Sequence, residues 1–359
     1  MSRPNQARLD LTALRNNVSL VRELAPQSKL MAVVKANAYG HGAVIIAQAL
    51  ESQVDALAVA CIEEAEELRN AGIAAPVLLL EGVFEPAELR LAAQLGLWIT
   101  IENEQQLNWL EQAELAAPIQ CWLKVDTGMN RLGVSPAAAE VFYQRIVDSK
   151  NSSATPVLYT HFASADDTSS DQTLSQLAVF DALSLSAPRS AANSAGLMAW
   201  PKAHYDWVRP GYMLYGNSPF IAPHSNAKTL QPVMTLTSAI ISLRDVAVGE
   251  TVGYAGSWTA QRPSRIATVT IGYGDGYPRM APNGTPVLVR GKTAKLAGRV
   301  SMDMITVDVT DIRDVQLGDE VVLWGGEIPL PKIARLAGTI GYELTTRMPA
   351  RTPRVILDA

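Results

Sequence analysis

Cysteine is scarce in this chain, which has only Cys61 and Cys121 among its 359 residues and no CxxC pair. Two widely separated cysteines provide neither a disulfide framework nor a structural zinc site, and they are typical of a reducing compartment. The four histidines show no spacing that would ligate a metal ion. We therefore expect a cytoplasmic protein without a metal site.

The chain also lacks blocks of like charge and long apolar runs. Its net charge is -5, with acidic and basic residues interspersed, which disfavours a nucleic-acid-binding surface. No run reaches the roughly 18 apolar residues of a membrane-spanning helix. Residues 1–6 lack the apolar core of a signal peptide. With 48% hydrophobic and 18% charged residues, we expect a globular protein that binds neither nucleic acid nor membranes.

The chain is long enough for two domains, and its first part has one regular pattern. From residue 30 to about 215, apolar runs alternate with amphipathic helical stretches such as 62–71, 86–95 and 103–115. This alternation is typical of a parallel sheet covered on both faces, and eight runs predict a closed, TIM-like α/β barrel. The predicted strands are Leu30–Lys35, Ala56–Ala60, Val77–Glu81, Trp98–Ile101, Gln120–Val125, Val157–His161, Ser190–Asn193 and Trp207–Val208.

The pattern changes after about residue 225, beyond a proline-containing linker at 217–230. Alternating or β-branched segments there predict a mainly antiparallel β-domain. We expect domains at residues 1–225 and 226–359. A first strand near Ala7–Leu11, before a helix capped at Asp10 or Thr12, is expected to pair with the second domain. The predicted strands of that domain are Val233–Arg244, Arg265–Ile271, Thr285–Arg290, Met304–Val309 and Glu320–Trp324.

Reactive side chains stand where the predicted barrel strands end. Lys35 ends the first strand, Lys124 and Asp126 end the fifth, His161 ends the sixth and Arg209 ends the eighth. Barrel enzymes carry their active sites at the carboxyl ends of the strands. Each residue alone has an ordinary structural explanation, but their joint placement predicts one site at that mouth.

The chemistry of this mouth indicates a cofactor. A lysine at the end of a rigid strand, here Lys35 followed by a small, turn-forming run, can form a Schiff base with an aldehyde when its pKa is lowered. The loops after strands seven and eight, where such barrels usually bind phosphate, contain Ser194 and Gly211. A hydroxyl can donate a hydrogen bond to an anion, and a glycine lets backbone amides come close to it, so these loops suit an anion. Together these features predict pyridoxal 5'-phosphate.

Residues 34–42 (VKANAYGHG) resemble the cofactor-lysine signature of bacterial alanine racemases, which are pyridoxal-phosphate-dependent enzymes of fold type III. The resemblance implies an isomerase that interconverts L-alanine and D-alanine, supplying D-alanine as a peptidoglycan precursor. It also implies a homodimer in which the C-terminal domain contributes to the partner's active site. Further matching segments are Leu123–Gly133, Thr160–Ala163, Trp207–Gly211, Val252–Tyr254, Ile271–Tyr277, Ser301–Met304 and Gly341–Leu344.

The resemblance also assigns catalytic roles residue by residue. Lys35 would hold the cofactor and act as the base on one face of the substrate. Tyr254 of a partner subunit would be the opposing base, with His161 hydrogen-bonded between it and Arg209. Arg209 would face the pyridine nitrogen, which stays neutral because a guanidinium cannot accept its proton.

Other matching positions imply binding and support. Arg131 and, from the partner, Met302 would bind the substrate carboxylate. Lys124 matches a lysine that is often carbamylated in the family and orients the arginine. Tyr273 and Tyr277 resemble entrance tyrosines that restrict the site to small substrates, and Asp303 lies beside Met302 in a supporting position. The phosphate contacts implied are Tyr39, Ser194, the amides of Gly211 and Tyr212, and Tyr342.

Three alternatives use the same residues. A fold-type III amino-acid decarboxylase would need an acid at the position of Arg209 and a cysteine in the C-terminal half, where this chain has none. A non-catalytic carrier of the cofactor would not need a β-domain with Tyr254 and Met302. A racemase of another small amino acid stays open, as does a catabolic instead of a biosynthetic role.

Overall fold

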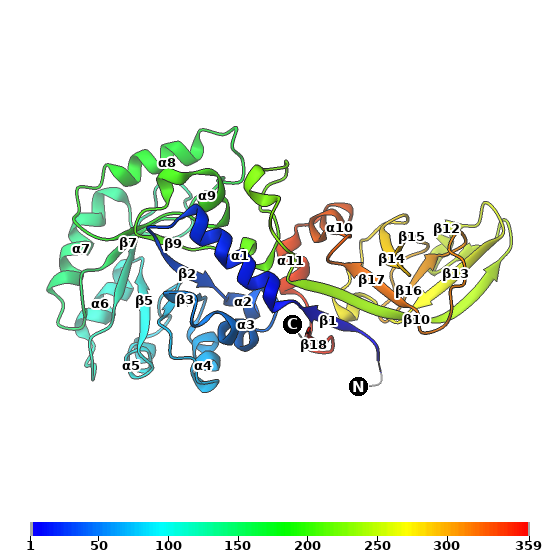
Figure 1. The fold of residues 1–359 in the computed structure, drawn as a ribbon. Coiled ribbons are helices and arrows are strands. Elements are labelled where there is room, and N and C mark those ends of the chain that lie inside the picture. The colour runs from blue at the N-terminus through cyan, green and yellow to red at the C-terminus, as the bar shows by residue number, and fades with distance from the viewer. Residues whose placement is uncertain (1–2, 358–359) are drawn as a thin grey trace.

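The computed structural model describes residues 3–357, which form a barrel and a β-domain lying side by side (Figure 1). The chain begins with β1 (Gln6–Leu9) near the boundary between these two bodies and then passes through the barrel. It then builds the β-domain and returns to the boundary with β18 (Arg354–Ile356). The strands β1 and β18 therefore both lie close to the boundary.

Eight parallel strands close the barrel, which confirms the prediction from the alternating apolar runs. Each strand pairs with the next one along the chain, and the last pairs with the first, with Leu30 opposite Val208. The carboxyl ends of all eight strands consequently meet at one mouth. The strands are β2 (Lys29–Val33), β3 (Ala56–Val59), β4 (Val77–Leu79), β5 (Leu97–Ile101), β6 (Cys121–Lys124), β7 (Val157–Tyr159), β8 (Arg189–Ser190) and β9 (Trp207–Val208).

Amphipathic helices surround the strands and pack their apolar sides against them. The carboxylate of Asp10 caps α1 by accepting a hydrogen bond from the amide of Ala13, and Asn103 caps α6 in the same way. The predicted stretches 62–71, 86–95 and 103–115 form α4, α5 and α6, of which α6 ends early, at Gln112. These three helices are α4 (Ile62–Asn70), α5 (Pro86–Gln94) and α6 (Glu104–Gln112). Further helices around the barrel are α1 (Leu11–Leu24), α3 (Ala43–Leu50), α7 (Ala139–Asp148), α8 (Gln172–Asp181) and α9 (Ser194–Ala199).

Large aromatic side chains fill the inside of the barrel. The rings of Trp98, Trp122 and Trp207 have centroids between 5.5 and 6.2 Å apart. The ring of Tyr159 meets Trp122 edge-on at 5.7 Å. The barrel is therefore a packed core that offers a binding site only at its mouth.

The β-domain is built on an eight-stranded sheet. β1 pairs antiparallel with β10 and parallel with β18, so the first and last strands of the described chain both join this sheet. The five strands predicted after residue 225 are confirmed as β10, β13, β14, β16 and β17. These strands and β15 span Met234–Val246 (β10), Ser264–Val269 (β13), Pro286–Val289 (β14), Lys292–Leu296 (β15), Ile305–Asp308 (β16) and Glu320–Trp324 (β17).

Several short elements are not apparent from the sequence pattern. β15 follows β14 through Arg290 and Gly291, whose φ angles of 52° and 71° suit a tight hairpin turn that more often contains Asn-Gly. The strands β11 (Thr251–Val252) and β12 (Trp258–Thr259) and the helices α10 (Leu330–Leu336) and α11 (Gly341–Thr346) are too short to show a period. Within residues 3–357, no helix combines the length and apolarity that crossing a bilayer requires.

Candidate active site

The chain makes a left-handed turn directly after the first barrel strand, in the segment labelled α2 (Lys35–Tyr39) in Figure 1. Residues 36–39 have φ angles between 50° and 55°, and Gly40 follows at 80°. This conformation costs roughly 1–2 kcal/mol for each residue with a Cβ. The side-chain oxygen of Asn37 offsets part of that cost by accepting the amide of Ala43 at 2.7 Å. The strained turn bears Lys35 and Tyr39 at the mouth of the barrel, as strain at functional sites often does.

A group of positive side chains meets at this mouth. Burial lowers the pKa of Lys124 to about 8, and the charges of Arg131 and Arg209 add to this effect. Burial and the same arginines lower the pKa of His161 well below its usual value, so the imidazole is neutral at pH 7. Lys35 contributes to both shifts. The structure thus brings these five residues together, although they come from four different strand ends.

Arg209 is fixed below the mouth by oxygen atoms of neighbouring strand ends. Its guanidinium donates to the carbonyl of Thr160 at 2.6 Å, to that of Ala191 at 3.4 Å and to the hydroxyl of Ser190. Within the described part of the chain, no hydrogen bond joins Arg209 to His161. The expected hydrogen-bonded chain through His161 is therefore not formed within a single copy of the protein.

The loops after β8 and β9 form a cradle of amides and hydroxyls. The hydroxyl of Ser194 accepts the amides of Gly211 at 3.0 Å and Met213 at 3.3 Å. A Cβ at Gly211 would lie 2.5 Å from the hydroxyl oxygen of Tyr39, so a larger residue would displace that tyrosine. Glycine here leaves room for the Tyr39 hydroxyl beside the residue whose amide binds Ser194.

The second domain completes the cradle. Tyr342, in α11, stacks on Tyr212 with 3.7 Å between ring centroids and 14° between planes, and its ring lies 6.1 Å from that of Tyr39. Burial raises the pKa of Tyr39 to about 12 and the pKa values of Tyr212 and Tyr342 further, so all three keep their hydroxyl protons at pH 7. These neutral donors, with Ser194, fit a phosphate group.

Tyr254 lies far from this mouth in its own chain. It begins the short turn η5 (Tyr254–Gly256) between β11 and β12, and Figure 1 shows β12 at the end of the β-domain remote from the barrel. The residue is 71% exposed. A single copy of the chain therefore does not bring Tyr254 to Lys35.

Met302 and Tyr273 lie together in two neighbouring loops of the β-domain. The amide of Gly274, in the turn η6 (Tyr273–Asp275), donates to the carbonyl of Met302 at 2.8 Å. Met302 is 54% exposed and Tyr273 38% exposed. Both side chains can therefore contact another molecule or another copy of the chain.

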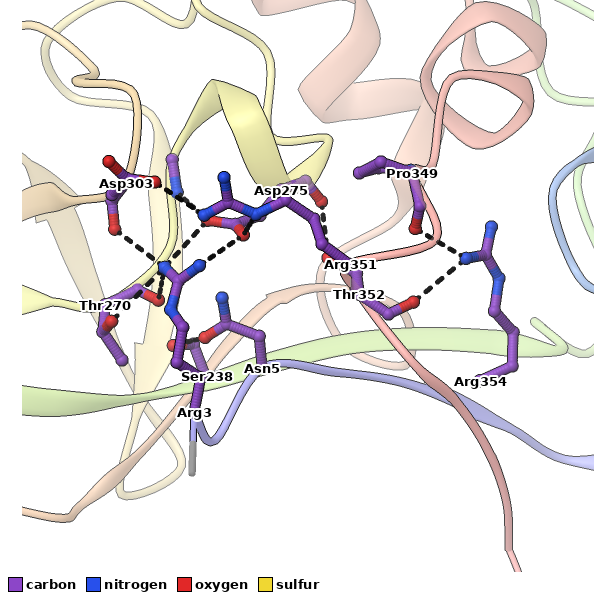
Figure 2. A network of polar contacts seen from close by, with 11 residues as sticks. Arg3, Asn5, Ser238, Thr270, Asp275, Asp303, Pro349, Arg351, Thr352 and Arg354 are labelled. Carbon is purple, nitrogen blue, oxygen red and sulfur yellow. Dashed lines mark hydrogen bonds and ion pairs between the residues drawn. The ribbon is translucent and has the colours of Figure 1, made fainter. Parts of the chain in front are cut away.

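A buried carboxylate holds these loops in place (Figure 2). Asp275 is fully buried and pairs with Arg3 at 2.9 Å and Arg351 at 2.7 Å. Arg351 also binds the carboxylate of Asp303 at 2.6 Å, which fixes the residue after Met302. The sequence pattern does not reveal this network, because Arg3 and Asp275 are 272 positions apart.

The expectation that Tyr277 lines an entrance is wrong. Its ring is 1% exposed and stacks on Trp324 in the core of the β-domain, with 6.1 Å between centroids. Gly276, with a φ of 99°, turns the chain inward between Tyr273 and Tyr277. Of the two tyrosines, only Tyr273 faces solvent.

Comparison with known proteins agrees with this architecture. Residues 9–219 match the family model for the alanine racemase N-terminal domain, and residues 233–356 match that for the alanine racemase C-terminal domain. The alanine racemase of Pseudomonas taetrolens is 50% identical over 98% of each chain, as is the catabolic alanine racemase of Pseudomonas putida. The crystal structure of biosynthetic alanine racemase from Pseudomonas aeruginosa has a TM-score of 0.95 and 47% identity, covering 99% of this chain and 100% of that one. With its barrel, β-domain and lysine-bearing turn, this chain belongs to the alanine racemase family.

Proposed function

We propose that this chain is a pyridoxal 5'-phosphate-dependent racemase that interconverts L-alanine and D-alanine. The observation that carries the proposal is the meeting of Lys35, Arg209 and the cradle of hydroxyls and amides at one barrel mouth, in a chain whose relatives of similar length are alanine racemases. The amine, the guanidinium and the neutral hydroxyls together match the aldehyde, ring and phosphate of this cofactor.

The cofactor would be held by residues of the barrel and of α11. Lys35 would bind it covalently through the side-chain amine, and Arg209 would face the ring nitrogen and leave it unprotonated. When bound, the cofactor supplies an electron-withdrawing ring that weakens the bond between Cα and its hydrogen. The phosphate would be bound by Tyr39, Ser194, Tyr342 and the amides of Gly211 and Tyr212.

Racemisation needs proton-carrying groups on opposite faces of the substrate Cα. We assign the amine of Lys35 to one face and the hydroxyl of Tyr254 from a second copy to the other, because Tyr254 is exposed and remote from its own barrel. One group removes the α-proton and the other delivers one, with the roles exchanged for the opposite enantiomer. His161, neutral at the mouth, would accept the incoming tyrosine's hydrogen bond. The working unit would then be a homodimer with shared sites.

The remaining assigned residues would bind and select the substrate. Arg131 is exposed at the mouth, where its guanidinium would pair with the alanine carboxylate together with Met302 of the second copy. Lys124 would support Arg131. Tyr273 would limit the size of the side chain that enters, and Asp303 would hold the Met302 loop through Arg351.

A cytoplasmic location is supported by the two cysteines, Cys61 and Cys121, which are both free thiols as expected in a reducing compartment. There the enzyme would supply D-alanine as a peptidoglycan precursor. Deleting its gene should then create a requirement for D-alanine during growth. Normal growth without D-alanine, in a strain with no second racemase, would favour the catabolic role.

The direct test is formation of D-alanine from L-alanine by the purified protein with pyridoxal 5'-phosphate, measured with a coupled D-amino-acid oxidase assay. Activity should be lost in Lys35→Ala and retained in Lys29→Ala, which removes an exposed lysine from the other end of the same strand. Absence of turnover with cofactor bound would contradict alanine as substrate and favour another small amino acid.

A further inference from the structure

The left-handed turn after β2 is held by two side chains that have no part in the function proposed above. The carbonyl oxygens of Ala38 and Tyr39 accept hydrogen bonds from His41, and that of Gly40 accepts from Arg354. Because this conformation is strained at four consecutive residues, it persists only where surrounding contacts enforce it. These two side chains supply such contacts.

His41 holds the turn from the inside. It is fully buried, and its ring stacks on Tyr215 with 4.5 Å between centroids. Its Nδ1 lies 3.0 Å from the carbonyl oxygens of both Ala38 and Tyr39. Since both neighbours can only accept, Nδ1 carries the proton, and Nε2 is a bare acceptor with no hydrogen-bond partner among residues 3–357. A buried acceptor without a partner is costly, so the contacts made by the rest of the ring must outweigh that cost.

Arg354, in β18, holds the turn from the second domain. Its Nε and Nη2 donate to the carbonyl oxygen of Gly40 at 2.9 and 2.7 Å. The same guanidinium donates to the carbonyls of Met348, Pro349 and Thr352 at 2.8 to 3.0 Å, and Figure 2 shows the last two of these contacts. All five N–H groups of the guanidinium are thereby used on backbone oxygens. Within the described residues no carboxylate pairs with it.

The two contacts connect distant parts of the molecule. Gly40 and Arg354 are 314 positions apart, and β18 pairs with β1 in the sheet of the β-domain. The carbonyl of Thr345, in α11, is so close to Gly40 that a Cβ there would overlap it. The turn is therefore enclosed between the barrel and the last elements of the chain. Lys35 and Tyr39 stand at its two ends, so a change in its backbone angles would move both.

We propose that Arg354 and His41 are positioning residues that fix the left-handed turn, so that the Lys35 amine and the Tyr39 hydroxyl are already placed before the cofactor binds. The inference rests on the proposed function for the identity of the cofactor. According to this proposal, Arg354 in β18 raises the affinity for the cofactor without contacting it. A site prepared in this way loses less free energy to ordering when the ligand arrives.

The test compares Arg354→Met and Arg354→Lys with the control Arg313→Met, which removes an exposed arginine of the β-domain. Hydrogen exchange of a peptide covering residues 36–42 is measured in the protein freed of cofactor, and pyridoxal 5'-phosphate is then titrated by its visible absorption. In Arg354→Met we expect exchange about tenfold faster and a Kd about tenfold higher, with KM for alanine of the loaded enzyme within about twofold. Arg354→Lys should be intermediate, because an ammonium cannot span Gly40 and Pro349 together.

His41 is tested by two substitutions that separate stacking from hydrogen bonding. His41→Phe keeps an aromatic ring against Tyr215 and removes the donor, whereas His41→Asn keeps a donor near the carbonyls and removes the ring. Exchange in the turn should be faster in His41→Phe than in His41→Asn. The reverse order would overturn the part assigned to His41.

The outcomes separate the two proposals. A folded Arg354→Met protein with unchanged exchange and unchanged Kd, or one that loses only thermal stability, would overturn the positioning role. If Arg354→Met does not fold, Arg354→Lys decides by the same measurements. If the unmodified protein neither binds the cofactor nor racemises alanine, the proposed function fails, and hydrogen exchange alone still shows whether Arg354 holds the turn.

Discussion

Lys124 is expected to take up carbon dioxide as a carbamate near neutral pH. Burial and then the charges of Arg131 and Arg209 lower the pKa of its amine from 10.5 to about 8. At pH 7 about a tenth of the amine is then neutral, compared with roughly 0.03% at the ordinary pKa. The reactive form is therefore roughly 300-fold more abundant than in an exposed lysine.

The surroundings of Lys124 also favour the product. The ammonium first loses one proton to solvent; the neutral amine then attacks carbon dioxide, a nitrogen–carbon bond forms and a second proton leaves, so the side chain changes from a cation to an anion. Arg131 and Arg209, which disfavour the ammonium, then face a negative group and stabilise it. Glu102 acts in the opposite direction, but the cations outnumber it. A carbamate would in turn hold Arg131 in position for the substrate carboxylate.

Carbon-13 NMR of the protein incubated with labelled bicarbonate should show a carbamate signal. The signal should be absent in Lys124→Met and unchanged in Lys150→Met, which removes an exposed lysine. Lys124→Met should raise KM for alanine about fivefold, the effect of losing one hydrogen-bonded support for Arg131 worth about 1 kcal/mol. A spectrum without the signal in the unmodified protein, or one that keeps it in Lys124→Met, would refute this reasoning.

Three further predictions concern the cradle, the second base and pH. Gly211→Ala should raise the Kd for pyridoxal 5'-phosphate about tenfold, because the new Cβ would lie 2.5 Å from the Tyr39 hydroxyl oxygen; an unchanged titration would contradict the cradle. Tyr254→Phe should slow exchange of the alanine α-proton with deuterated solvent unequally for the two enantiomers, as followed by proton NMR, and equal slowing would contradict two separate bases. The free energy of unfolding should fall by up to about 3 kcal/mol from His41 as pH falls from 6.5 to about 4, since burial lowers the pKa of the native imidazole to about 4 and the unfolded chain binds the proton first. Urea titrations across this range should show a shallower fall in His41→Phe, and an identical slope would show that His41 does not contribute.

The sequence by itself determined the barrel and the five longer-range strand segments of the β-domain that correspond to β10, β13, β14, β16 and β17. A parallel sheet covered on both faces requires runs such as Ala56–Ala60 that are apolar at every position, and such runs alternating with helical patterns fit few other folds. The pattern also indicates which residues stand at strand ends, such as Lys35 and Arg209. Most individual roles came from the resemblance of whole motifs to one family, because spacing alone does not distinguish a phosphate loop from an ordinary turn.

Tertiary structure alone decided the details on which the chemistry depends. The left-handed turn at residues 36–39 has no local signal, since alanine and tyrosine normally avoid that conformation. Its restraint by Arg354 and the burial of Asp275 between Arg3 and Arg351 depend on residues far apart in the chain. Local periodicity records which face of an element is buried. It does not record which distant group supplies the hydrogen bond or charge that holds a strained backbone in place.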